Sequence, residues 1–221
     1  MAEFIPFSQR FFNKFRYSLL LGPAKEPITL AEAKSWLGID ATVTEFDSEI
    51  TLLITAARVD VEKFLCLALI TQTWRLSLDV LPSDCNFFNL SSVQIILSKP
   101  PLQSVTSVTV FDSAETPTVI DSTNYLVRTY EGDCPEYGRV VFKRDFTFPN
   151  ISELREADAF EIDFIAGYGD DEDDVPEGIR NAILMEIAFR FLNKGDCVDE
   201  TMGVTCLAAL TCVQQYRKMK L

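Results

Sequence analysis

The chain has 221 residues, a net charge of −13 and no histidine. This acidic balance disfavours a dedicated DNA-binding protein, which needs basic groups for the phosphates. Without histidine, the chain lacks the usual general base and the commonest metal ligand near neutral pH. Its six cysteines contain no CxxC pair, which argues against a zinc site. A hydrophobic fraction of 48% is enough for a core, and no apolar run reaches the roughly 18 residues of a membrane span.

Residues 1–28 are predicted to form an N-terminal arm, which is interrupted by three prolines. The first part of this arm is rich in phenylalanine. Its aromatic residues are Phe4, Phe7, Phe11, Phe12 and Phe15. In a core helix such residues would be ordinary, but this stretch lies outside the periodic part of the sequence. Exposed aromatic groups lower solubility unless a partner covers them, so we expect the arm to contact another protein.

Two helices are expected after the arm. The sequence from Thr29 to Glu32 is a capping box, and the helix that it opens should end near Gly38. A second helix is expected to begin at Asp47 or Ser48. Its apolar positions recur at spacings of three and four, and they are Ile50, Leu53, Ile54, Ala57, Val61, Phe64 and Leu65. Cys66 continues this pattern and is expected to be a buried free thiol.

The hydrophobic period then changes from that of a helix to that of a strand, with apolar and polar residues in alternation. Turn residues separate the segments. Strands are expected at 73–80, 93–97, 105–111, 125–129, 139–142 and 160–166. Six short strands in about 100 residues predict a small antiparallel sandwich or barrel.

Five consecutive acids follow the last expected strand. They are Asp170, Asp171, Glu172, Asp173 and Asp174. Carboxylates could bind calcium, but the loop has neither the spacing, the turn glycine nor the closing glutamate of an EF-hand. We therefore favour a solvated loop, exposed at a surface or at a lumen, over a structural metal site.

The C-terminal region again has helical periodicity. A helix that begins at Pro176 and ends near Lys194 should present a broad apolar face, and a final helix is expected from about Thr205 to Lys218. The predicted fold class is α+β. A helical bundle forms from residues 29–70 and 175–221, and an antiparallel β-rich domain, residues 71–169, is inserted into it.

No enzymatic site is expected. Gly167 and Gly169 do not belong to any nucleotide-binding fingerprint. A serine-based triad cannot be assembled without histidine. The sequence therefore predicts no catalytic residue, no cofactor-binding residue, no metal ligand and no cofactor.

Several segments resemble the head–tail connector proteins, or head-completion adaptors, of tailed bacteriophages. They occur in the family's order and extend from about residue 17 to residue 218. They are "EPITLAEAKSWLGID" (26–40), "DSEITLLITAARVDVEKFLCLALITQTWRLSLD" (47–79), "KPPLQSVTSVTVFD" (99–112), "NYLV" (124–127), "IDFIAGYG" (162–169), "VPEGIRNAILMEIAFRF" (175–191) and "YR" (216–217). The Phe-rich stretch 1–16 is an extension, and the segment after Lys194 departs from the family pattern.

The resemblance implies a structural virion protein of the neck, present in the host cytoplasm before assembly. Usually twelve copies form a ring that joins the portal protein to the tail, with a tail, stopper or nozzle protein below it, and DNA passes through without specific binding. The other possibility is a monomeric binding module associated with the capsid or tail.

The C-terminal helix is expected to dock on a partner, because a short terminal helix needs a partner surface and its basic end would complement an acidic neighbour. The resemblance implies that this partner is the portal. The expected contacts are Leu210, Val213, Gln214, Tyr216, Arg217, Lys218, Lys220 and Leu221. Alternatively, this helix only completes the helical bundle of its own subunit.

Overall fold

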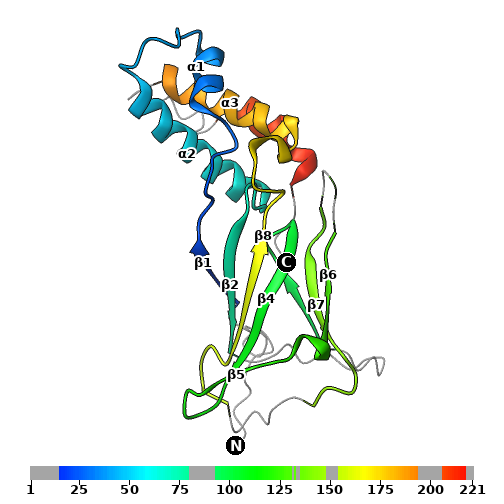
Figure 1. Ribbon diagram of the computed structural model, residues 1–221. Helices are drawn as coiled ribbons and strands as arrows, with labels where there is room; N and C mark the ends of the chain where they lie inside the picture. The colour runs from blue at the N-terminus through cyan, green and yellow to red at the C-terminus, as the bar shows by residue number, and fades with distance from the viewer. Residues whose placement is uncertain are drawn as a thin grey trace, which may run out of the picture.

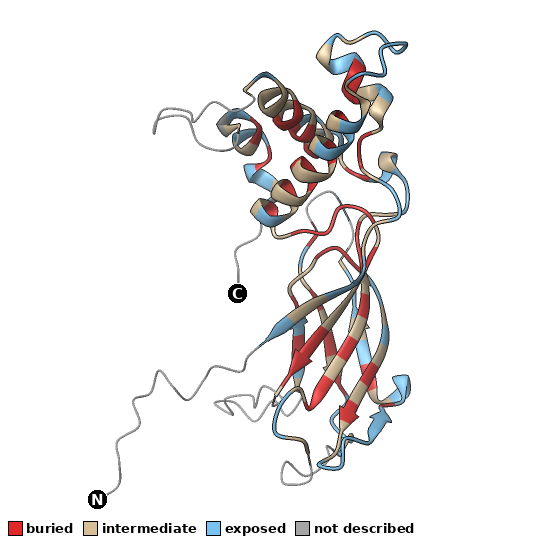
Figure 2. Cartoon of the chain, turned by 90° about the vertical axis from the view of Figure 1, so that its left-hand side faces the viewer, coloured by how far each residue is buried: buried red, intermediate tan, exposed pale blue. Residues whose placement is uncertain are grey.

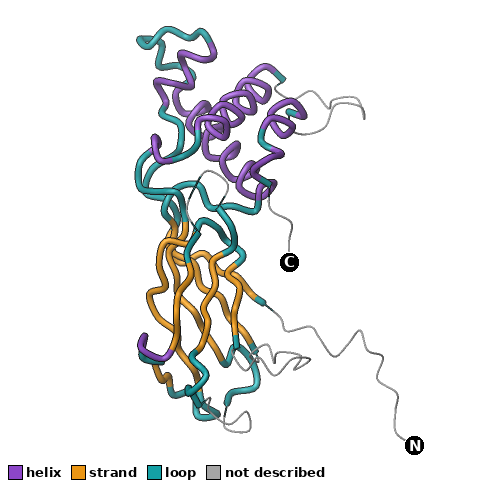
Figure 3. The backbone as a smooth tube through the Cα atoms, turned by 90° about the vertical axis from the view of Figure 1, so that its right-hand side faces the viewer, coloured by secondary structure: helices purple, strands orange, loops and turns teal. Residues whose placement is uncertain are grey.

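The computed structural model describes residues 15–79, 93–130, 132, 135–147, 154–193 and 206–217. Helices lie at one end of an elongated molecule and strands at the other (Figures 1 and 3). The chain is α+β and its sheets are antiparallel. We call the two ends the helical part and the β part.

The helical part combines segments from both halves of the sequence (Figure 1). Its helices are α1 (Leu30–Leu37), α2 (Asp47–Leu65), α3 (Glu177–Leu192) and α4 (Leu207–Cys212), with 3-10 turns η4 (Glu172–Asp174) and η5 (Gln214–Tyr216). One apolar cluster contains buried residues from all four helices, with Ile54 of α2 and Ile183 of α3 among them. None of the described helices is long and apolar enough to cross a membrane.

The ends of α1 follow the local sequence signals. The Thr29 hydroxyl accepts a hydrogen bond from Glu32 N at 3.2 Å, and the Glu32 carboxylate accepts one from Thr29 N at 2.8 Å. Gly38 ends the helix with φ of 71°, a left-handed conformation that glycine adopts without strain. The predicted capping box and C-terminal stop are both confirmed.

The β part consists of two sheets that share one cluster of buried residues, and Figure 2 colours the buried positions of their strands red. Its elements are β1 (Arg16–Leu21), β2 (Gln72–Leu78), β3 (Gln94–Leu97), β4 (Leu102–Phe111), β5 (Pro117–Val119), η2 (Ser122–Asn124), β6 (Tyr125–Arg128), β7 (Gly138–Phe142) and β8 (Phe160–Ala166). One sheet has the order β1-β2-β8-β4-β5 and the other β3-β7-β6. The alternation along β8, buried at Phe160, Ile162 and Phe164, is that of a strand with one face in the core. All six predicted strands are present, with ends shifted by up to three residues.

The prediction that residues 1–28 form an arm is wrong for Arg16–Leu21, which form edge strand β1. This strand pairs antiparallel with β2, with Arg16 opposite Ser77 and Leu19 opposite Trp74. The sequence RYSLLL did not indicate a strand, because its three consecutive leucines break the apolar–polar alternation that is typical of a strand with one buried face. Of the five arm phenylalanines, Phe15 is described; Phe4, Phe7, Phe11 and Phe12 lie outside the described residues.

Three backbone segments meet where the two parts join, and hydrogen bonds connect them. Tyr168 N donates to Leu69 O, and Gly167 N donates to Pro101 O, both at 2.9 Å. Gly167 has φ of 139°, and a Cβ at this position would lie 2.6 Å from the carbonyl carbon of Ile70. The close backbone approach therefore requires glycine.

The connecting residues also alternate between the two cores. Leu67 and Leu69 are buried in the helical cluster, whereas Ala68 is buried in the β cluster. Ala68 N donates to Pro100 O at 2.9 Å, which joins the connecting residues directly to the segment that contains Pro100 and Pro101. Because such bonds restrict rotation of one part against the other, we describe the junction as a fixed waist.

Candidate interaction surfaces

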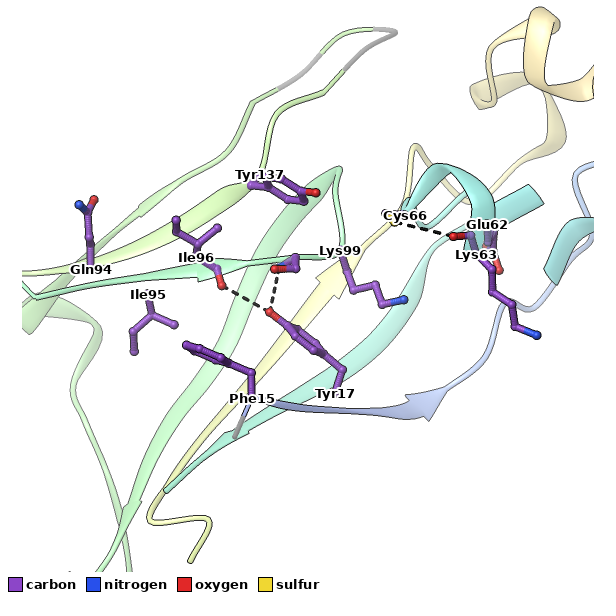
Figure 4. Close-up of a pocket in the computed structure, with 11 residues that line it drawn as sticks. Phe15, Tyr17, Glu62, Lys63, Cys66, Gln94, Ile95, Ile96, Lys99 and Tyr137 are labelled. Atoms are coloured by element: carbon purple, nitrogen blue, oxygen red, sulfur yellow. Dashed lines mark hydrogen bonds between the residues drawn. The ribbon is translucent and has the colours of Figure 1, made fainter. Parts of the chain in front are cut away.

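A groove of about 550 Å³ opens between the edge strands β1 and β3 (Figure 4). We call it the β1–β3 groove. Phe15 and Tyr17 line one wall, Ile95 and Ile96 of β3 line the other, and Cys66 lies at the end nearest the waist. The edges of both sheets meet here, since β1 ends one sheet and β3 ends the other. The groove is thus a seam of the sandwich that neither sheet closes.

Tyr17 spans this seam. Its hydroxyl accepts a hydrogen bond from Ser98 N at 2.9 Å and lies 3.4 Å from Ile96 O, to which it donates. Its ring packs edge-on against Phe164, with centroids 6.3 Å apart. Burial raises the pKa of the Tyr17 hydroxyl, so the neutral group that can both donate and accept is retained. Tyr17 therefore fixes the distance between the two edge strands.

β1 and the residue that precedes it expose several apolar side chains, which is unusual for an edge strand. Exposed fractions are 50% for Phe15, 49% for Leu19, 48% for Leu20 and 67% for Leu21. An exposed edge strand is a template for pairing with another chain. β1 begins with Arg16 and has a register shift between Leu19 and Leu21, but its three leucines are still exposed. An uncovered row of this kind indicates a protein-binding surface. The sequence analysis missed it, because it assigned these leucines to the arm.

The end of the groove nearest the waist is polar. The Glu62 carboxylate accepts hydrogen bonds from Leu69 N at 3.0 Å and from Gln72 Nε2 at 2.6 Å. Burial raises the pKa of Glu62 in spite of these bonds and the neighbouring Arg58. Cys66, at the end of α2, is partly buried with φ of 59°. It lies beyond the helix and lines the groove. The thiol is free as predicted, but the predicted burial is wrong, since Cys66 is only partly buried.

The acidic loop is exposed at Asp170, Asp171, Asp173 and Asp174. It is nevertheless held to the helical part by two cations: Lys25 pairs with Asp171, and Arg180 Nη1 lies 3.3 Å from Asp173. Asp171 N also donates to Asp174 Oδ2 at 3.0 Å. With these contacts, the five acids form the loop that leads into α3. No group of His, Cys, Asp or Glu in the described part of the chain is placed to hold a metal ion.

Sequence reasoning found the acids of this loop but missed both of their partners. Arg180 also pairs with Glu32 of the α1 capping box, so one guanidinium joins α1, the loop and α3. Arg180, the fourth residue of α3, is the sequence signal that could have indicated a cationic partner for the acids. Whether the loop faces a channel stays a prediction.

The C-terminal helix is shorter than expected. α4 ends at Cys212, and the chain continues as the 3-10 turn η5. Val213 is fully buried in the helical cluster, so it is not available to a portal and is removed from the predicted contacts. The Arg217 guanidinium lies 4.7 Å from the centre of the Phe64 ring. These contacts show that the segment does complete its own subunit.

The other predicted contact residues differ in how exposed they are. Leu210 and Tyr216 are half-buried, and Gln214 is exposed. Lys218, Lys220 and Leu221 lie outside the described residues. Among the described residues, Gln214 and Arg217 are thus exposed close to the buried Val213.

No protein-family model matches the sequence, and no curated protein is significantly similar to it. Solved structures do share its fold. A chain from the neck of an empty gene transfer agent particle, computed with C6 symmetry, has a TM-score of 0.72 and 18% identity, covering 93% of this chain and 97% of that one.

Two further chains have the same fold. One is from the virion of a native gene transfer agent particle, with a TM-score of 0.67 and 16% identity over 93% of this chain and 96% of that one. The other is from the neck of a native particle computed with C12 symmetry, with a TM-score of 0.63 and 18% identity over 94% and 96%. The resemblance to phage neck proteins that the sequence shows is confirmed at the level of the fold.

Proposed function

We propose that this chain is a structural, non-enzymatic subunit of a ring in the neck of a phage-like particle, where it joins the portal to the tail. The observation that carries the proposal is the shared fold with chains from particle necks, over more than nine-tenths of this chain. Because the likeness includes both the helical part and the β part, it supports the role of a whole subunit rather than of one module.

The exposed apolar residues favour a ring over a monomer. They occur on both parts of the molecule, with Leu21 at 67% on β1 and Leu52 at 69% on α2. A monomer would expose these side chains to water at both ends, whereas neighbours in a ring would cover them. One of the structures with the same fold was computed with C12 symmetry, and we propose twelve copies here.

The charge of the chain fits a channel for DNA. Each copy carries −13, so a closed ring concentrates negative charge around its axis. Phosphates are repelled by such a surface, and DNA can pass without being held. Asp170, Asp173 and Asp174 are the residues of the acidic loop that we assign to this lining or to the outer ring surface.

The portal contact is assigned to the C-terminal end of the chain. Val213 anchors this end in its own subunit. Leu210, Gln214 and the basic residues Lys218 and Lys220 are then presented to the portal. We assign the remaining partner, a tail, stopper or nozzle protein, to the β part.

The experiment is assembly of the purified chain on purified portal rings, with electron microscopy and mass measurement of the product. A symmetrical ring stacked on the portal is expected. Deletion of residues 218–221, which leaves Val213 in place, should weaken this binding. A chain that remains monomeric with portal present would contradict the ring and support a monomeric binding module instead.

A further inference from the structure

We propose that the β1–β3 groove receives the Phe-rich N-terminal segment, residues 1–14, of the neighbouring copy in the ring. This inference rests on the proposed ring and adds the contact that links one subunit to the next. Three features point to this arrangement: the groove, the two strands beside it that lie at sheet edges in the described part of the chain, and the place where the N-terminal segment joins the groove.

The walls of the groove suit aromatic side chains. Phe15 and Ile96 are 50% and 41% exposed, and Tyr137 lies opposite Tyr17 across the opening (Figure 4). A volume of about 550 Å³ lies within the range in which pockets bury compact apolar groups. Water in a groove of this kind is readily displaced by phenylalanine, since each buried ring removes a large apolar area from solvent.

The strand edges suit an extended backbone. Phe142 N donates to Val93 O, so the alternate residues of β3, Gln94 and Ile96, direct their backbone groups away from β7. Tyr17 binds Ile96 O and Ser98 N at one end of this edge. The rest of the edge is the kind of template on which a peptide from another chain adds as a strand.

The N-terminal segment has the matching composition and reach. Residues 1–14, MAEFIPFSQRFFNK, contain four phenylalanines and Ile5. Fully extended, fourteen residues span about 45–50 Å. The segment joins the described chain at Phe15, which is itself a wall of the groove. The groove therefore lies beside the start of its own subunit's segment, and the segment of a neighbour can reach it if that neighbour's Phe15 lies within about 45–50 Å.

The direction of β1 favours the neighbour's segment over the subunit's own. β1 runs from Arg16, opposite Ser77, to Leu21, opposite Thr73 and close to the waist. The groove extends in the same direction, from Phe15 towards Cys66. A subunit's own segment would have to reverse immediately before Phe15, beside its own β1. A segment from an adjacent copy enters without that reversal.

Cys66 makes a direct test possible, because its thiol lines the groove. Cysteine is introduced at Phe4, Phe7 or Phe11, one position at a time, and rings assembled on portal are oxidised. The expected result on a non-reducing gel is a ladder of covalent multimers for at least one position. The ladder should disappear when Cys66→Ser is added. A cross-link confined to single chains, or no Cys66-dependent cross-link at any position, would overturn the proposal.

A second measurement does not depend on disulfide chemistry. Ile96→Glu places a charge in the groove, and Val119→Glu places one on β5 at the far edge of the other sheet, where Val119 is 64% exposed. Ile96→Glu should lower the affinity between ring subunits by at least about tenfold, and Val119→Glu should not. Both variants should keep the melting temperature of the isolated chain.

Removal of residues 2–14 separates this inference from the proposed function. Loss of closed rings, with portal binding by single subunits retained, is the expected result. If the shortened chain forms rings as well as the full chain does, the segment is not the link and this inference fails while the proposed function stands. If the full chain forms no ring, both fail together.

Discussion

The helical part and the β part stabilise their cores in different ways. In the helical part, three charged residues are buried among the apolar side chains: Lys34, Arg58 and Glu186. Among the described residues of the β part, the buried polar side chains are the uncharged Gln72 and Ser77. Strands are aligned by their backbone ladders and by strict alternation, whereas helices can rotate and slide against each other. Buried ion pairs supply directional contacts that a smooth apolar interface lacks.

Two of these buried charges, Lys34 and Glu186, connect different segments of the helical part. Lys34 Nζ of α1 donates to Val43 O at 2.6 Å and pairs with Asp47 at 2.8 Å, so it holds the α1–α2 loop. Glu186 accepts from Arg190 Nε and from Cys206 N, both at 2.7 Å, and thereby ties α4 to α3. Arg190 also pairs with Asp60 of α2. The positions of these helices are therefore set by a few polar contacts.

The largest loss of stability is expected from a cavity in the β core. Phe164 is fully buried on β8 and packs against Tyr17 of β1. Phe164→Ala should lower the free energy of unfolding by about 3–5 kcal/mol in urea titrations. Phe15→Ala, at a half-exposed phenylalanine, is the matched control and should cost far less. An equal loss of free energy of unfolding in both variants would mean that burial of Phe164 in the β core adds little to the stability of the chain.

Glu186→Ala tests the polar contacts of the helical part. It leaves Arg190 without its buried partner and Cys206 N without an acceptor, and about 3 kcal/mol should be lost. Glu186→Gln keeps an acceptor for Cys206 N and should lose less. Unchanged stability for both variants would contradict the idea that polar contacts align the helices. Hydrogen exchange in α4 should rise first, since that helix depends on the contact.

Local signals in the sequence predicted much of this fold. The Thr29 capping box, the helical spacing from Ile50 to Leu65 and the alternation from Phe160 to Ala166 each depend on residues close in sequence. The order of strands does not, because β1 joins β2 across some fifty residues of helix and loop. Leu19–Leu21 carried no periodicity that would have revealed that pairing.

The interaction surfaces were harder to predict than the fold, because they depend on distant segments that meet in space. The β1–β3 groove combines Phe15, Cys66 and Ile96, which share no motif. Likewise, the acidic loop was visible as a run of acids, but Lys25, the partner of Asp171, lies 146 residues earlier in the sequence. The sequence could not show that Val213 is fully buried and Leu210 only half-buried, since both fit the same helical spacing.

A smaller effect is expected from the cap of α1. Thr29→Ala removes the oxygen that accepts from Glu32 N, and about 1 kcal/mol of stability should be lost. The comparison is Asp121→Ala in the β part, where the side chain accepts from Thr123 N at 2.8 Å but caps only the 3-10 turn η2. The Asp121 variant should lose less, as measured by urea unfolding. A larger loss of stability for Asp121→Ala than for Thr29→Ala would show that this turn of the β part contributes more to stability than the cap of α1.

The smallest effect is expected in the acidic loop. Asp171 and Asp173 form ion pairs at the surface, and Asp173 is 89% exposed, so water and salt weaken these contacts. Asp171→Asn combined with Asp173→Asn should change the melting temperature by less than about 1 °C, and a chelator should change nothing. Asp163→Asn is the matched control in the β part, because Asp163 accepts two hydrogen bonds from Arg75, at 2.7 and 2.8 Å, and is only 19% exposed. It should destabilise more, since a bidentate and partly buried pair loses less to solvent. A fall of several degrees in chelator would instead identify a bound ion and overturn the assignment of this loop as a solvated start of α3.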